Sequence, residues 1–164
     1  MPSLKAIVPD RMPVDAKRMR RELEAAINKT LDAVRSDFRR TVRTWKEQPV
    51  FVLVKARAVG AHLEGEVHTT NEIYRYVTRG TRPHPIVAKN AARLLFKSSG
   101  FLPKTHRRVI GSGRGREGSG WATADAVDHP GTEAREFEEE IAARKQRNLE
   151  NAVTAAVLRA VKGR

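Results

Sequence analysis

The most constraining stretch of this 164-residue sequence is the turn at residues 127–132, together with the segment behind it. Pro130 has no amide proton and Gly131 can adopt positive φ, so the pair ends any strand that precedes them. Thr132 can cap a following helix, and the acidic residues of 133–140 then lie at the positive end of that helix. The stretch therefore predicts a strand that turns directly into a long C-terminal helix.

A second long helix is predicted near the N-terminus. Asp15 is a suitable cap, and apolar residues recur every three or four positions from Met19 to Trp45. That spacing places them on one face of a helix, which can pack on a sheet of the same chain or on a partner helix. Pro49 ends the element. Residues 1–14 contain prolines and no periodicity, which predicts an extended N-terminal arm.

Short strands are predicted in the middle of the chain. Residues 50–54 form a continuous apolar run, typical of a strand buried on both faces. Residues 63–69 alternate as in a hairpin with one wet side, and a short helix follows from Asn71 to Gly80. Further strand-like segments are residues 86–88, 93–97 and 121–127.

The order of helix, strands, short helix, strands and helix predicts an α+β domain over residues 15–164, with helices on one face of a mostly antiparallel sheet. The alanine-rich link at 88–92 fits a helix or a connection equally well. Residues 103–120 are rich in Gly, Ser and Arg. Such a run cannot bury apolar surface, so it predicts a flexible loop across which residues 121–127 pair back.

The net charge of +13 points to a polyanionic or acidic partner. No acidic residue occurs between Glu72 and Glu117, so the middle of the chain carries most of the excess. Two interpretations stay open, a solvated basic surface and non-specific contact with DNA backbone. The cations expected to face DNA or a lumen are Lys104, Arg107, Arg108, Arg114 and Arg116.

The sequence gives little support for catalysis, a metal or a cofactor, and we predict that the protein is not an enzyme. It has no cysteine, and its five histidines lack metal-ligand spacing. His84 and His129 stand beside turn prolines, as backbone-bonding histidines do. Glu64, Glu66 and His68 share one strand face, but alternation on a wet hairpin explains that. No apolar run approaches the ~20 residues that span a bilayer, and the N-terminus has no secretory signal pattern.

Three short segments resemble a known protein family. They read Tyr74-x-Tyr76-Val77-x-x-Gly80-Thr81-Arg82-Pro83-His84-Pro85-Ile86, then Leu94-x-Phe96, then Val127-Asp128-His129-Pro130-Gly131-Thr132-x-Ala134-Arg135-x-Phe137. This pattern is similar to the small neck or tail-completion proteins of long-tailed bacteriophages, also described as minor tail components or head–tail joining proteins. The resemblance covers roughly residues 15–162. In the family a proline usually precedes the phenylalanine of the last segment, and here Glu136 holds that place.

The resemblance implies an α+β fold without catalysis or cofactor, and a protein of the virion at the head–tail junction, assembled in the cytoplasm of the bacterial host. Its implied partners are further copies in a homo-oligomeric ring (a hexamer or similar), head-closure or stopper proteins, tail-tube or terminator proteins, and packaged double-stranded DNA without sequence preference. No membrane is implied. The residues expected at a subunit or partner interface are Arg79, Thr81, Arg82, His84, His129, Thr132 and Phe137.

Two alternatives stay open. The protein can be a free-standing, non-specific nucleic-acid-binding protein, which steep salt dependence of DNA binding by the isolated chain would reveal. Within the phage interpretation, a tail terminator is the alternative to a neck protein.

Overall fold

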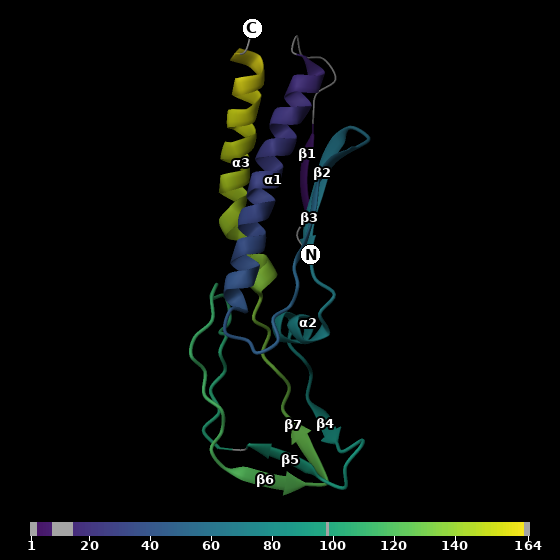
Figure 1. Cartoon of the computed structure of the whole chain (residues 1–164), viewed down its shortest axis with the longest axis vertical. Coiled ribbons are helices and arrows are strands. Elements are labelled where there is room, and N and C mark those ends of the chain that lie inside the picture. The colour runs from purple at the N-terminus through teal and green to yellow at the C-terminus, as the bar shows by residue number, and fades with distance from the viewer. Residues whose placement is uncertain (1–2, 8–14, 98, 163–164) are drawn as a thin grey trace. The chain divides into compact units, whose positions relative to one another are not determined.

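The computed structural model describes residues 3–7, 15–97 and 99–162, and it confirms the predicted α+β class. Figure 1 shows the long helices, the short helix and the antiparallel strands. The elements are β1 Ser3–Ile7, α1 Ala16–Thr41, β2 Val52–Val59, β3 His62–His68, α2 Glu72–Arg79, β4 His84–Val87, β5 Leu94–Lys97, β6 Trp121–Ala124, β7 Ala126–His129 and α3 Phe137–Lys162.

Contacts divide the chain into two compact units, where the sequence predicted one domain over 15–164. Each unit buries its own apolar side chains, among them Leu31 and Leu63 in unit 1 and Tyr74 and Val42 in unit 2. Unit 1 consists of Met1–Arg39, Val50–Thr70 and Glu138–Arg164, and unit 2 of Arg40–Pro49 and Asn71–Phe137.

Helix α1 begins at the predicted cap. The Asp15 carboxylate accepts hydrogen bonds from the backbone amides of Lys17 and Arg18, at 2.9 and 3.3 Å, which satisfies two of the free amides of the first turn. The predicted apolar stripe is buried from Met19 onward. The helix ends at Thr41, earlier than predicted, because the chain tightens into a turn in which the Trp45 amide bonds to the Val42 carbonyl at 2.9 Å.

Unit 1 contains a three-stranded antiparallel sheet in the order β1-β3-β2. The hairpin predicted at residues 63–69 is confirmed, since Leu63 and Val67 are buried while Glu66 on the opposite face is exposed. Part of the predicted N-terminal arm adds to this sheet, because β1 pairs with β3 over its full length. The rest of the arm, residues 1–2 and 8–14, lies outside the described residues.

The prediction that residues 50–54 form a strand buried on both faces is wrong. Val50 is 74 % exposed and Val52 is 46 % exposed, whereas Phe51 is buried and stacks on Phe38 with ring centroids 5.2 Å apart. Helix α1 packs on one face of this sheet, and its Asn28 carboxamide oxygen accepts the Ala56 amide at 2.8 Å. The valines on the other face therefore remain in solvent.

Helix α3 runs antiparallel to α1 within unit 1 (Figure 1), and ion pairs at both ends of this packing fix the register. Lys145 reaches the buried Asp37 carboxylate at 3.0 Å, and Arg159 reaches Glu22 at 2.7 Å. Ile141, Ala156 and Ala160 of α3 are buried in this packing, while Val161 is 41 % exposed. No helix in the described part of the chain is long and apolar enough to cross a membrane.

Helix α2 in unit 2 follows its local signals. The Asn71 carboxamide oxygen accepts the Tyr74 amide at 2.8 Å as an N-cap, and Gly80 ends the helix at a φ of 73°. Tyr74 and Thr78 face the interior of the unit. The Tyr74 ring lies between Trp45 and Phe137, with centroid distances of 6.4 and 6.2 Å. These aromatic contacts form the core of unit 2.

Gly65 tests the packing of α1 on the sheet of unit 1. A Cβ at this position would lie 2.6 Å from the Leu31 Cδ1 and 3.0 Å from the Ala56 amide nitrogen. We expect Gly65→Ala to lower the free energy of unfolding by about 1–3 kcal/mol, measured by urea denaturation, because overpacked atoms must move apart. In a Leu31→Val background, which lacks the Cδ1 atom, the same change should cost less. Equal costs in both backgrounds would contradict the contact.

Candidate functional site

Residues 81–132 of unit 2 form one long antiparallel ribbon that folds back on itself. Its two-stranded parts are β4 with β7 and β5 with β6, and backbone bonds continue the pairing past β5. The paired positions from base to tip are Thr81–Thr132, His84–His129 to Val87–Ala126, Leu94–Ala124 to Lys97–Trp121, Ser99–Ser119, Leu102–Arg116 and Lys104–Gly113.

One insertion interrupts the ribbon. Residues 88–93 lie opposite the single residue Asp125, and the Arg93 guanidinium reaches the Asp125 carboxylate at 3.0 Å. The alanine-rich link that the sequence left undecided is therefore a non-helical connection. The segment predicted as one strand at 121–127 is divided in two at Asp125, because each half pairs with a different strand.

A pair of reciprocal hydrogen bonds, which we call the clasp, closes the base of the ribbon. The Thr81 and Thr132 amides each donate to the other residue's carbonyl, at 3.0 and 3.1 Å. Gly80 and Gly131 flank the clasp with φ of 73° and 87°. A Cβ on Gly131 would collide with the Thr81 carbonyl oxygen, and one on Gly80 with the Thr132 carbonyl oxygen. Both positions therefore require glycine, because a side chain would keep the two paired segments apart.

The clasp corrects the prediction that Thr132 caps the C-terminal helix. Thr132 is hydrogen-bonded to Thr81, and α3 begins five residues later, at Phe137. Above the clasp, His84 and His129 face each other with ring centroids 5.1 Å apart. His84 Nδ1 lies 2.8 Å from the Arg82 carbonyl oxygen, and His129 Nδ1 accepts the Gly131 amide at 3.0 Å. The interpretation of both as backbone-bonding turn histidines is confirmed.

The tip of the ribbon, residues 104–113, folds back to the base of the ribbon, where Glu136 binds it. The Glu136 carboxylate receives the Arg107 guanidinium at 2.5 Å and the Arg108 guanidinium at 2.7 Å. The Arg108 amide also donates to the Arg135 carbonyl at 2.9 Å. Hydrogen bonds from Arg107 and Arg108 lower the pKa of Glu136, and the bond to Glu136 raises the pKa of Arg107.

Residues 41–44 provide a second anchor for the tip. The Lys104 ammonium donates to the Thr44 carbonyl at 2.9 Å, the Thr44 hydroxyl donates to the Gly113 carbonyl at 3.4 Å, and the Ser112 hydroxyl donates to the Thr41 carbonyl. The prediction of a flexible loop at 103–120 therefore needs correction. Glycines allow the close backbone pairing, and the polar side chains bind backbone carbonyls, so the segment is held without burying apolar surface.

Glu136 occupies the position at which the resembled family has proline. Its φ is 51°, and its amide donates to the Thr78 carbonyl at 3.0 Å. Proline cannot adopt that φ, and it has no amide proton to donate. This backbone therefore excludes proline at position 136, and Glu136 supplies the carboxylate that binds the tip, while α3 begins at the next residue, Phe137.

The structure divides the five cations predicted to face DNA. Four make contacts within unit 2, since Arg107 and Arg108 bind Glu136, Lys104 binds Thr44, and the Arg116 Nε donates to the Gly100 carbonyl at 2.7 Å. Arg114 is exposed and makes no ion pair or hydrogen bond with the described residues. The predicted cluster is therefore mainly a set of structural cations.

The predicted interface residues also separate into groups. Arg79, Arg82 and His84 are exposed, and Thr81, His129 and Thr132 are half-buried at the clasp. Phe137 is fully buried against Tyr74, so its assignment to an interface is corrected: it is a core residue of unit 2.

Sequence reasoning missed the exposed apolar side chains of the ribbon. Trp121 is 64 % exposed and Leu95 is 65 % exposed, on strands that lie opposite each other, and Phe101 further along is 66 % exposed. The sequence predicted strands at residues 93–97 and 121–127, but it did not indicate that these side chains remain in solvent. One signal could have identified these exposed side chains. They lie beside glycine-rich and charged runs, which contain no apolar segment that could cover them.

Candidate acid–base and metal groups lie elsewhere. In unit 1, His62 pairs with Glu64 at 2.7 Å and His68 pairs with Glu66 at 3.1 Å, all on the wet face of β3. Across residues 3–7, 15–97 and 99–162, no three histidine or carboxylate side chains gather closely enough to hold a metal ion.

Comparison with protein-family models, with curated proteins and with solved structures finds no match to this chain.

The clasp predicts a specific effect of Gly131→Ala. We expect a loss of unfolding free energy that exceeds that of Gly60→Ala by about 1 kcal/mol or more, because a Cβ on Gly131 meets the Thr81 carbonyl oxygen. Gly60 is the matched control, since it has a φ of 60° but no atom within 4 Å of its Cβ position. Denaturant titration measures both. Equal losses would mean that backbone conformation alone accounts for the effect.

The ion pairs of Glu136 lead to a prediction about protease cleavage in the tip. Because its folded pKa is lowered, the stabilisation from its ion pairs is complete at neutral pH and is lost as pH falls through that depressed pKa. Glu136→Gln should release Arg107 and Arg108 and speed trypsin cleavage after them severalfold at neutral pH. Glu133→Gln is the control, because Glu133 lies 3.8 Å from Arg107 and does not contact Arg108. Similar cleavage rates in both variants would contradict the role of Glu136.

Proposed function

We propose that this chain is a non-enzymatic structural protein of a long-tailed phage virion, a neck or tail-completion protein that assembles in a ring and joins the tail to the head. The resemblance motivates the proposal. Its two most specific motifs, Gly80-Thr81 and His129-Pro130-Gly131-Thr132, meet at the clasp. A shared motif is thus tied to one structural element, the base of the ribbon.

The observation that carries the proposal is the uncovered apolar surface of the ribbon. Two-stranded ribbons are marginally stable in water and need packing partners. Here β4 is exposed along its whole length, and Leu95 and Trp121 are about two-thirds exposed. Apolar side chains in such positions favour burial against another protein. A subunit of an assembly gains that burial from its neighbours.

The proposed neighbours are further copies of the chain in a ring, a head-closure or stopper protein, and a tail-tube or terminator protein. The proposed location is the head–tail junction of the virion, with assembly in the cytoplasm of the bacterial host. Arg79, Arg82 and Arg114 are exposed and make no ion pair with the described residues. They are the cations best placed to contact packaged DNA without reading its sequence.

The same three arginines favour a second candidate function, a free-standing protein that binds nucleic acid non-specifically. DNA binding by the isolated chain that weakens steeply with salt would support it. Charge reversal at Arg82 and Arg114 is the cleaner test of either DNA role, because reversal at Arg107 or Arg108 also breaks the contact with Glu136. A tail terminator remains the alternative within the phage proposal.

Electron microscopy of particles from a strain that lacks the gene tests the proposal. We expect DNA-filled heads beside separate finished tails, and joined particles again when the wild-type gene is supplied. A Leu95→Ser/Trp121→Ser variant should fail to restore joining. Val50→Ser is the matched control, because Val50 is 74 % exposed but lies outside the ribbon. Normally joined particles without the gene would overturn the proposal.

A further inference from the structure

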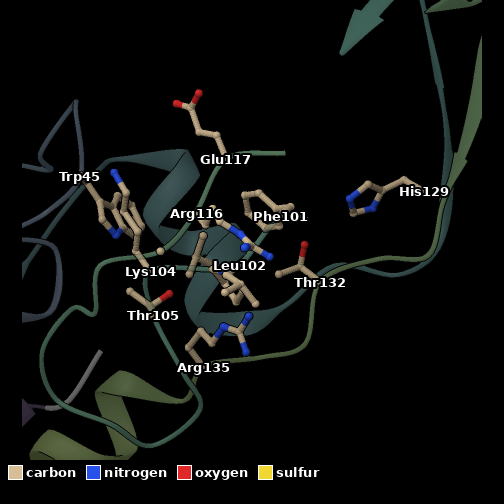
Figure 2. A pocket seen from close by; sticks show the side chains of 13 residues that line it. Trp45, Phe101, Leu102, Lys104, Thr105, Arg116, Glu117, His129, Thr132 and Arg135 are labelled. Carbon is tan, nitrogen blue, oxygen red and sulfur yellow. The ribbon is translucent and has the colours of Figure 1, made fainter. Parts of the chain in front are cut away.

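The fold of the ribbon forms a partly open pocket of about 550 Å³, a volume typical of ligand sites (Figure 2). The returning arm of the ribbon forms one side, and α2 and residues 129–135 near the clasp contribute the other, so the pocket lies wholly within unit 2. Most of its wall is apolar. The apolar side chains that line it are Trp45, Val77, Phe101, Leu102 and Pro103.

Cations converge on this apolar space. In Figure 2 the Arg116 and Arg135 side chains extend toward Leu102 from opposite sides. The Arg135 side chain is only 13 % exposed; one terminal nitrogen contacts Glu133 at 3.3 Å, and its buried Nε has no hydrogen-bond partner. Arg135 therefore has hydrogen-bonding capacity that the contact with Glu133 does not use. Lys104, whose ammonium uses one donor on Thr44, adds a further charge to the lining.

The pocket lacks a free internal anion. Glu117 is the one acidic residue that lines it, and its carboxylate is held by the Lys97 ammonium at 2.6 Å and points away from Leu102 in Figure 2. His129 adds a donor, because its Nδ1 accepts the Gly131 amide and a neutral ring then carries its proton on Nε2. Three cationic side chains and one paired carboxylate therefore surround the apolar walls.

We propose that this pocket binds a peptide segment of a partner protein that carries a carboxylate next to an apolar side chain. The guanidinium groups match a carboxylate in geometry and charge, and the walls match an aliphatic or aromatic side chain. Phe101 and Leu102 are 66 % and 54 % exposed, so the pocket is open along one wall, as a bound chain requires. The inference rests on the proposed function only in taking the partner to be an adjoining virion subunit.

Tryptophan fluorescence can test the site in the isolated protein. The chain has two tryptophans, and Trp121→Phe leaves Trp45, which lines the pocket, as the sole reporter. The probe is the peptide acetyl-Leu-Asp-Leu-Asp-Leu-amide, and we expect a saturable change in Trp45 emission. Two control peptides separate the contributions, one with asparagine for both aspartates and one with serine for all leucines. Both should bind about tenfold more weakly or worse.

Variants in this background connect binding to the pocket. Arg135→Gln and Arg116→Gln should each weaken binding of the acidic peptide about tenfold. Arg116→Gln should lower the melting temperature only slightly, because the one bond that it loses, to the Gly100 carbonyl, is exposed. Arg114→Gln removes the same charge outside the pocket and should leave binding within about twofold. The absence of saturable binding, equal binding of the asparagine peptide, or equal loss in Arg114→Gln would each overturn the site. Joined particles without the gene would overturn the head–tail role and leave this binding result intact.

Discussion

The carboxylate of Glu136 receives both Arg107 and Arg108, and this contact holds the tip of the ribbon together with the anchor at residues 41–44. The stretch between Glu72 and Glu117 contains no acidic residue, so its cations would repel one another if it were extended alone. Several of these cations pair with carboxylates further along the chain. Lys97 pairs with Glu117, Arg93 with Asp125, and the tip with Glu136. Charges separated in sequence are thus matched in space when the ribbon pairs.

Local signals predicted the elements that depend on neighbouring residues. The spacing from Met19 onward predicted the buried face of α1, and Asn71 and Gly80 predicted both ends of α2, because caps and periodicity act within a few residues. The start of α3 could not be predicted in this way. Thr132 is a good cap in isolation, but its pairing with Thr81, distant in sequence, prevents that role.

The ribbon was the least predictable part of the fold, and with it the candidate site. Glycine and arginine at 111–118 indicate flexibility in isolation, yet the segment is ordered by backbone pairing with residues 99–104 and by contacts to residues 41–44. Long-range pairing leaves no periodic pattern in so short a segment. The pocket follows from that pairing, so neither its walls nor the role of Arg135 could be inferred from the sequence.

Amide hydrogen exchange of the isolated protein, resolved by residue, tests the closed ribbon most directly. The account predicts slow exchange for the amides of Leu102, Arg108 and Arg116, which donate to the carbonyls of Arg116, Arg135 and Leu102 at 2.7, 2.9 and 2.8 Å. Arg114, whose amide has no such bond among the described residues, should exchange fast. Uniformly fast exchange from residue 99 to residue 119 would show a free loop and contradict the account.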